Sequence, residues 1–289
     1  MSTTARLEDT KTRRESATAA PGYRKSEKPS TQSPQNLIAR IEGVDWRGVE
    51  ASLDTRGFAP LPPLLTAGEC DALAALYQDD ARFRSRIEME RFRFGAGEYK
   101  YFAAPLPPIV QALRTVLYGR LAPVANRWAV RLTASAKATA VHRSLARRRK
   151  PDAMNDRYPE TLDAFLARCH KAGQRRPTPL LLSYTEGGYN CLHQDIYGEV
   201  AFPLQVVFVL DRVVVDYTGG EFLLVEQRPR AQSRGYAMTI EQGAGVVFST
   251  RERPAAGTRG TYRVVMRHGV STLTSGARMS LGIIFHDGT

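Results

Sequence analysis

A histidine and an aspartate separated by one residue, His193 and Asp195, lie in the stretch LLSYTEGGYNCLHQDIYGEV at positions 181–200. Histidine is scarce in this chain, with five in 289 residues. On a β-strand, side chains two residues apart project to the same side, so the imidazole and the carboxylate would point toward one place. Both groups bind metals, but two ligands do not make a site, and a third must come from elsewhere in the chain.

The third ligand is sought among the four other histidines. His142 and His170 fall in a basic, helix-rich part of the sequence, whereas His268 and His286 lie in the last two predicted strands. His268 is the better candidate, because Arg278 follows it at ten residues. The segment HGVSTLTSGARMS predicts a hairpin with its turn around TSGA, which would bring Arg278 beside the strand that carries His268.

Together, His193, Asp195 and His268 would form a set of two histidines and one carboxylate. Such a set suits ferrous iron and leaves coordination positions open for reactants. The sequence therefore predicts that these three residues are the metal ligands and the catalytic centre.

Arg278 is the candidate for holding a cosubstrate at an open iron. If that cosubstrate is 2-oxoglutarate, its distal carboxylate needs a buried cation, and a guanidinium can bind it through two parallel hydrogen bonds. Ser280 lies two residues on, on the same strand face, and Tyr184 lies just upstream of His193, so each could add a hydrogen bond. The alternative for all three is an ordinary structural role.

Two regions with different predicted secondary structure must position these residues. The first is mostly helical, with Thr66 as an expected N-cap, and the second consists of short β-rich runs separated by turn residues. We predict an α+β fold in which a helical support packs against an antiparallel β-core, a sandwich or a barrel. The expected organisation is a disordered polar tail at 1–36, a mainly helical support at 37–178 and a catalytic β-core at 179–289, the last two forming one integrated domain.

The composition is strongly basic. The formal net charge is +12, and part of it is concentrated in HRSLARRRK at 142–150 and HKAGQRR at 170–176. Such clusters can neutralise phosphates and attract DNA or RNA with a strong salt dependence. The alternative is a solvated surface that only favours solubility.

The chain contains no apolar run long enough for a signal-peptide core or a membrane span, which favours a cytoplasmic protein without membrane contact. The three cysteines, Cys70, Cys169 and Cys191, are odd in number and form no metal-binding pair. They are therefore expected to be reduced and mostly structural, with Cys191 at most a neighbour of the site.

Five motifs follow one another along the β-rich half: Tyr184-x-x-Gly187, His193-x-Asp195, Gly219-Gly220-Glu221, His268 and Arg278-x-Ser280. Together they resemble the pattern of the iron(II)- and 2-oxoglutarate-dependent oxygenase superfamily. The resemblance implies a double-stranded β-helix (jelly-roll) core at 179–289. It also implies an oxidoreductase of the dioxygenase type that uses Fe(II), 2-oxoglutarate and dioxygen.

Two longer sequence runs resemble a narrower family within this superfamily. HQDIYGEVAFPLQVVFVLD and GTRGTYRVVMRHGVSTLTSGARMSLGIIFHDG resemble a bacterial family described as 2-oxoglutarate and iron(II) oxygenases acting on damaged DNA. This resemblance implies DNA repair by oxidative demethylation or hydroxylation of alkylated nucleic acid. One departure is that AlkB-type DNA demethylases carry a second arginine six residues after the cosubstrate arginine, where this chain has Ile284.

Three functions fit the sequence. The first is an oxygenase of nucleic acid, in which Tyr189, Tyr197 and Tyr217 are candidates for stacking on a base. The second is a 2-oxoglutarate-dependent hydroxylase of a protein side chain or a small molecule. The third is a non-catalytic, cupin-like metal-binding module, which has no need of Arg278 with Ser280.

Overall fold

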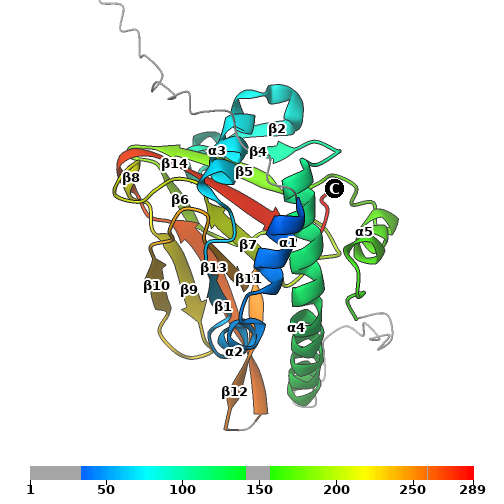
Figure 1. The fold of residues 1–289 in the computed structure, drawn as a ribbon. Helices are drawn as coiled ribbons and strands as arrows, with labels where there is room; N and C mark the ends of the chain where they lie inside the picture. The colour runs from blue at the N-terminus through cyan, green and yellow to red at the C-terminus, as the bar shows by residue number, and fades with distance from the viewer. Residues whose placement is uncertain (1–33, 141–156, 259) are drawn as a thin grey trace, which may run out of the picture. The chain divides into compact units, whose positions relative to one another are not determined.

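Two antiparallel β-sheets, with helices against one of them, make up the structure (Figure 1). The computed structural model describes residues 34–140, 157–258 and 260–289. In spatial order, the eight-stranded sheet contains β1 (Phe58–Leu61), β11 (Gly245–Ser249), β7 (Leu204–Val209), β14 (Leu273–Ile284), β5 (Leu180–Thr185), β4 (Glu98–Phe102) and β2 (Phe83–Glu88), with β8 (Tyr217–Gly219) beside β14. The six-stranded sheet contains β10 (Arg234–Met238), β9 (Phe222–Gln227), β13 (Gly260–Val270), β6 (Tyr189–His193) and β3 (Gly95–Ala96), with β12 (Glu252–Gly257) beside β13.

The chain winds back and forth between the two sheets. Strands β5, β7, β11 and β14 belong to the eight-stranded sheet, whereas β6, β9 and β13, which alternate with them along the chain, belong to the six-stranded sheet. This winding is that of a double-stranded β-helix, or jelly-roll. The predicted α+β fold, a jelly-roll core with an N-terminal helical support, is confirmed.

Two hydrophobic cores hold the layers together. Between the sheets, Val207 and Val246 of the eight-stranded sheet share a core with Leu224 and Val264 of the six-stranded sheet. On the other face, Phe208 shares a second core with residues of the helices. Val207 and Phe208 are adjacent on β7 and face opposite cores, because side chains alternate along a strand.

Five α-helices lie in the described residues: α1 (Pro34–Glu42), α2 (Trp46–Arg56), α3 (Ala67–Ala75), α4 (Pro108–Ala140) and α5 (Leu162–Lys171). Three short 3-10 turns link helices and strands: η1 (Leu76–Gln78), η2 (Asp80–Arg82) and η3 (Met89–Phe92). All five helices place buried apolar side chains in the second core, and α1 lies beside α4 (Figure 1). The helices thus support the sheet whose inner face borders the candidate site.

The expected N-cap at Thr66 is confirmed. The Thr66 hydroxyl accepts a hydrogen bond from the backbone N–H of Glu69, and the Glu69 carboxylate accepts one from the backbone N–H of Thr66. This reciprocal capping box satisfies two donors that the first turn of α3 would otherwise leave free.

The predicted tail is too long by three residues. Positions 34–36 belong to α1, which begins at Pro34, a residue well suited to a first helical turn because its missing N–H is not needed there. Leu37 and Ile41 of the same helix are fully buried, and this packing stabilises the turn before them. Positions 1–33 lie outside the described residues.

One expectation about the strands needs correction. The mainly helical region at 37–178 also supplies the short strands β1 to β4, and β1 and β4 pair with core strands β11 and β5. The predicted hairpin turn around TSGA is wrong, since β13 ends at Val270 and β14 already begins at Leu273. Strands β13 and β14 lie in different sheets, and the TSGA residues lie within β14 beside β8.

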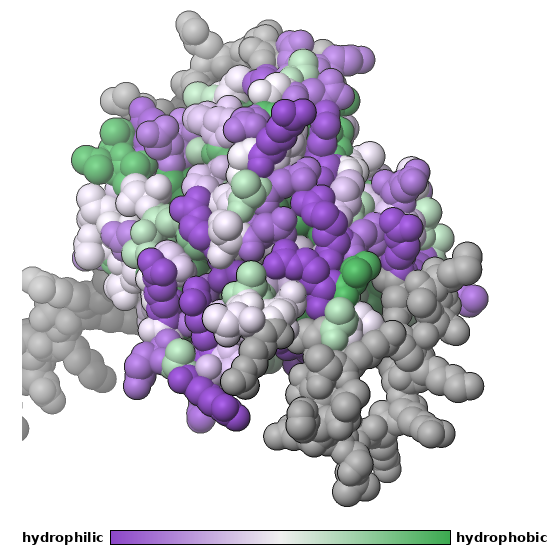
Figure 2. Space-filling model, turned by 90° about the horizontal axis from the view of Figure 1, so that it is seen from below, coloured by the Kyte–Doolittle hydropathy of each residue, from purple (hydrophilic) through white to green (hydrophobic). Residues whose placement is uncertain are grey.

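Among the described residues, no helix is both long enough and apolar enough to cross a membrane. Figure 2 shows the side seen from below in Figure 1, where hydrophilic residues predominate over the coloured part and the hydrophobic ones form small clusters.

Candidate active site

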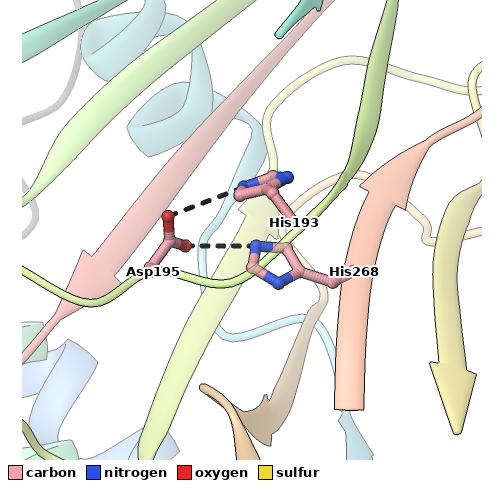
Figure 3. A group of neighbouring side chains, drawn as sticks. All are labelled: His193, Asp195 and His268. Atoms are coloured by element: carbon pink, nitrogen blue, oxygen red, sulfur yellow. Dashed lines mark ion pairs between the residues drawn. The ribbon is translucent and has the colours of Figure 1, made fainter. Parts of the chain in front are cut away.

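The three predicted metal ligands come together between the sheets. His193 is the last residue of β6, and His268 lies directly opposite it on the antiparallel strand β13. Asp195 follows two residues after His193, so the chain returns its carboxylate toward the imidazole (Figure 3). The register of one strand pair therefore joins residues that are far apart in sequence.

The ligand atoms of this cluster converge on one small volume. Asp195 Oδ1 lies 3.5 Å from His193 Nε2, and Asp195 Oδ2 lies 3.1 Å from His268 Nε2 (Figure 3). One nitrogen or oxygen from each residue lies within 4.8 Å of the others. The two imidazole rings are 4.1 Å apart between centroids. This donor set is the two-histidine, one-carboxylate combination that suits ferrous iron.

Hydrogen bonding orients His193 for metal binding. Its Nδ1 lies 2.7 Å from the backbone oxygen of Cys191, and because a carbonyl only accepts, Nδ1 must carry the proton. In the neutral ring Nε2 then keeps its lone pair, and this lone pair faces a carboxylate oxygen. A cation between the two groups would relieve that repulsion, so the residues present fit a metal ion.

Electrostatics favours the protonation states that bind metal. Burial by itself would raise the pKa of Asp195, but its pairing with His268 and then with His193 outweighs burial and holds the pKa below its usual range. Burial lowers the pKa of His268, and the neighbouring His193 adds to this effect. An ionised carboxylate beside a neutral imidazole is the form in which these ligands coordinate metals.

Arg278 lies in the same inter-sheet space. It pairs with Tyr184 across β14 and β5, is 1% exposed, and its Nη1 lies 3.5 Å from Ser280 Oγ. Its Nε has no hydrogen-bond partner, and within the described residues no ion pair involves this guanidinium. A buried cation with an unused N–H favours an anionic ligand, so the residues present also fit a carboxylate group.

The Gly219-Gly220-Glu221 motif makes room for this arginine. Gly220 has φ +65°, and a Cβ at this position would lie 3.1 Å from Arg278 Cδ and 2.8 Å from a methyl group of Leu273. Only glycine combines this left-handed backbone with so close an approach.

Tyr184 completes the group around the arginine. Its ring lies 5.9 Å from the Arg278 guanidinium carbon, and its hydroxyl accepts a hydrogen bond from Asn190 Nδ2 at 3.2 Å. Burial raises the pKa of Tyr184 to about 12, so its hydroxyl stays protonated and can donate. Arg278, Ser280 and Tyr184, which the sequence proposed as cosubstrate residues, therefore lie together.

One cavity of about 370 Å³ connects the metal-type cluster with the arginine. His193, Asp195 and His268 line it, as do Tyr184, Arg278 and Ser280. Its volume falls in the range of small-molecule sites. Sequence reasoning missed Gln205, which lines this cavity from β7 and whose buried amide nitrogen has no hydrogen-bond partner in the described part of the chain.

The tyrosines proposed for base stacking divide into different roles. Tyr217 is 3% exposed and packs in the inter-sheet core, so it cannot stack on a base and that prediction is wrong. Tyr197 donates a hydrogen bond to Asp195 Oδ1 at 2.7 Å, a role that no spacing rule could have indicated. Tyr189 remains exposed on β6.

The two other histidines in the described residues, His170 and His286, lie apart from the cluster. His142 lies outside the described residues. His170 pairs with Asp287 at 2.9 Å, and His286 is fully buried, with its Nδ1 accepting a hydrogen bond from the backbone N–H of Phe202. Neither belongs to the group of three possible ligands.

His286 makes stability depend on pH. Burial lowers its pKa from 6.5 to about 4, so as pH falls the unfolded chain takes up this proton before the folded chain does. The contribution of the neutral His286 side chain to the free energy of unfolding is therefore complete above pH 6.5 and is lost as pH falls to about 4. This contribution amounts to about 3 kcal/mol. We expect a His286→Asn variant, which cannot titrate, to lose less stability across this window in urea unfolding. Parallel pH curves for the two proteins would contradict a neutral buried His286.

Of the two basic segments, 170–176 belongs to the described residues and 142–150 lies outside them. In 170–176, Gln174 is fully buried and donates hydrogen bonds to the backbone oxygens of Tyr197 and Val200, which fixes the loop after Asp195. The lysine and arginine side chains of this segment, Lys171, Arg175 and Arg176, are exposed.

Comparison with known proteins identifies the family. A family model described as "Oxygenase, catalysing oxidative methylation of damaged DNA" matches residues 97–153 and 144–288. The chain belongs to this family. It is an iron(II)- and 2-oxoglutarate-dependent dioxygenase, an oxidoreductase that uses Fe(II), 2-oxoglutarate and dioxygen, and this assignment sets aside the non-catalytic, cupin-like alternative.

Similar proteins are found among bacterial sequences and solved structures. The uncharacterized protein Rv2227 of Mycobacterium tuberculosis is 47% identical over 186 residues, which cover 64% of this chain and 71% of that protein. A prolyl-4-hydroxylase from Pseudomonas putida is similar at 16% identity with a TM-score of 0.42, covering 87% of this chain and 100% of that one. An oxidoreductase of the 2OG-Fe(II) oxygenase family from Burkholderia pseudomallei is similar at 15% identity with a TM-score of 0.45, covering 84% and 92%.

Proposed function

We propose that this dioxygenase oxidises alkylated nucleic acid, with DNA as the principal substrate. The observation that carries the proposal is one cavity that joins the His193, Asp195 and His268 cluster to the buried guanidinium of Arg278, whose Nε–H has no partner among the described residues. The family description, with its reference to damaged DNA, and the net charge of +12 support nucleic acid as the substrate class.

In this proposal His193 Nε2, Asp195 and His268 Nε2 hold the iron. The Cys191 carbonyl fixes the tautomer and orientation of His193, and Tyr197 orients the Asp195 carboxylate. His268 is held between the strands by the rings of Phe248 and Phe222, at 4.7 and 6.0 Å between centroids. These contacts keep the donor atoms in place before the metal arrives.

Arg278 would bind the distal carboxylate of 2-oxoglutarate, with Ser280 and Tyr184 donating further hydrogen bonds. The arginine is buried, and its Nε–H has no partner among the described residues, so the carboxylate finds a free donor there. Anchoring this end directs the keto acid end toward the iron ligands along the cavity.

When bound, iron supplies the oxidation chemistry: dioxygen and 2-oxoglutarate give succinate and carbon dioxide, and one oxygen atom is inserted into a substrate C–H bond. On an N-methyl group the product is an N-hydroxymethyl group. Its C–N bond then breaks: the hydroxyl proton moves to the nitrogen, and the carbon leaves as formaldehyde. The chain contributes binding, orientation and exclusion of water from a cavity closed on both sides by sheets.

Tyr197→Phe tests the support of Asp195. Loss of the 2.7 Å hydrogen bond leaves the carboxylate free to turn away from the iron, and we expect Fe(II) affinity to fall about 10- to 100-fold. Anaerobic equilibrium dialysis measures this affinity, and Tyr189→Phe, which alters an exposed tyrosine nearby, is the matched control. Equal affinities in the two variants would show that Tyr197 does not act through the metal site.

The substrate class is tested by 2-oxoglutarate turnover with different substrates. Succinate and formaldehyde are measured with N-methylated single-stranded DNA, duplex DNA, RNA, a basic peptide and no substrate. We expect methylated DNA to stimulate succinate release with one formaldehyde per turnover. Stimulation by the peptide alone would favour the alternative, a hydroxylase of protein side chains or small molecules. The proposed substrate would place the enzyme in the bacterial cytoplasm, where DNA resides.

A further inference from the structure

A short segment at the rim of the cavity, RFRFGA at positions 91–96, is held against the strand that carries His193. It begins in η3 and ends in β3, where Gly95 pairs with Asn190 and Ala96 with Tyr189 of β6. The backbone N–H of Cys191 also donates a hydrogen bond to the carbonyl of Phe94 at 2.8 Å. The segment is therefore fixed to β6, close to the iron ligand at its end.

Gly95 allows this close approach. Its φ is +143°, and a Cβ at this position would lie 2.3 Å from the backbone oxygen of Tyr189, a distance at which real atoms clash. A side chain at this position would push the segment away from β6. The neighbouring phenylalanines are thus presented by a fixed backbone.

Phe92 and Phe94 are exposed although they are large and apolar. Their side chains are 53% and 47% exposed, and their rings stack on each other with centroids 5.5 Å apart and planes 21° apart. Phe94 also lines the cavity. Ordering two aromatic rings at the surface, next to a functional cavity, indicates a surface that a ligand covers.

Exposed apolar side chains concentrate in the segments that supply this rim, and Phe94 and Leu192 among them line the cavity itself. Five of the eight large hydrophobic residues that are exposed in the described part of the chain lie in two adjacent segments: Phe92, Phe94, Tyr189, Leu192 and Ile196. Scattered exposed residues need no explanation, but a cluster around one cavity does.

The charges beside the rings decide what kind of ligand fits. Arg93 lines the cavity, is exposed, and forms no ion pair within the described residues, whereas Arg91 pairs with Glu88 at 2.7 Å. Aromatic faces alternating with arginines suit a ligand that alternates planar groups with anions. Single-stranded DNA has this composition, because its bases stack on aromatic rings and its phosphates attract arginine.

We propose that Phe92 and Phe94 form a stacking platform for the base next to the one that enters the cavity, with Arg93 beside its phosphate. This inference rests on the proposed function and adds that the preferred substrate is single-stranded or locally unpaired DNA. In a duplex both faces of each base are covered by its neighbours, so the platform could not reach them.

The platform is tested by fluorescence anisotropy with a single-stranded oligonucleotide that contains one N-methylated base. We expect the double variant Phe92→Ala, Phe94→Ala to bind it about 10- to 100-fold more weakly than wild type. Phe92→Trp, Phe94→Trp should keep wild-type affinity, and Phe92→Leu, Phe94→Leu should recover only part of it, because leucine is apolar but does not stack. Val214→Ala, Val215→Ala removes two exposed apolar side chains outside the cavity and is the matched control.

A second oligonucleotide, with an abasic site next to the methylated base, links the effect to one base. Wild type should bind it more weakly than the intact strand, whereas the double alanine variant should bind both equally. Arg93→Gln should lower the dependence of binding on the logarithm of salt concentration by about one unit.

Two outcomes would overturn the platform. One is equal binding of the intact oligonucleotide by wild type and the double alanine variant. The other is a loss of affinity for the abasic oligonucleotide, relative to the intact one, that is as large in that variant as in wild type. If the wild-type enzyme turns over methylated DNA, either result refutes the platform and leaves the proposed function standing. A wild-type enzyme that consumes no methylated DNA refutes the proposed function itself.

Discussion

Replacing any one of His193, Asp195 and His268 by alanine should lower Fe(II) affinity by about three orders of magnitude or more and abolish turnover. Each ligand of a tightly bound divalent ion contributes several kcal/mol, and the two ligands that remain cannot form the three-residue face. The fold should persist, because Val207, Leu224 and the other core residues hold the sheets together without metal. Anaerobic equilibrium dialysis and succinate release measure the two effects, and circular dichroism monitors the fold.

His170→Ala is the matched control for these variants. His170 also pairs with an aspartate, at 2.9 Å from Asp287, but it is not part of the cluster. This control should bind iron as wild type does. Normal iron binding by His268→Ala would contradict the ligand assignment, and the buried His286 would then be the next residue to replace.

Arg278→Ala should raise the concentration of 2-oxoglutarate needed for half-maximal turnover steeply. Removing the partner of a desolvated carboxylate costs about 2 to 5 kcal/mol, which corresponds to roughly 30- to 5000-fold in affinity. Arg278→Lys should recover only part of the loss, because an ammonium cannot form the planar pair of hydrogen bonds. Isothermal titration with 2-oxoglutarate under anaerobic conditions measures the affinity directly.

Arg267→Ala is the control for the removal of one positive charge. Arg267 is exposed on β13 beside His268, whereas Arg278 is 1% exposed. The control should keep wild-type affinity for 2-oxoglutarate. If Arg278→Ala also kept it, another group in the cavity, such as the unpaired amide of Gln205, would have to hold the carboxylate.

The sequence patterns were sufficient to predict a β-core and the grouping of the metal-type residues, and the resemblance to a known family implied the jelly-roll. Alternating apolar and polar residues define strands locally, and His193 and Asp195 share one short stretch. His268 could be found because few histidines lie in the β-rich half, so the choice was narrow. The fold was then confirmed, and the three residues do converge between the sheets.

Features that depend on contacts through space could not be predicted. Arg278 reaches the cavity by pairing with Tyr184 across β5, not through the predicted hairpin with β13, because the chain crosses between sheets after Val270. Tyr197 looked like a candidate for base stacking, but its hydroxyl is bonded to Asp195.

The rim of the cavity illustrates the same limit. RFRFGAG has no clear helical or strand periodicity, and only the pairing of β3 with β6 places Phe92 and Phe94 near the strand that carries His193. Local patterns specify which residues form an element, whereas the partner of a short edge strand is decided by tertiary packing.

The central claim is that one cavity holds iron on His193, Asp195 and His268 and 2-oxoglutarate on Arg278. Anomalous diffraction from crystals grown with Mn(II) and 2-oxoglutarate, without oxygen, tests it most directly. We expect one anomalous peak bonded to Nε2 of both histidines and to the aspartate, with the distal carboxylate of 2-oxoglutarate paired to the Arg278 guanidinium. A peak at other residues, or a carboxylate bound away from Arg278, would contradict the claim.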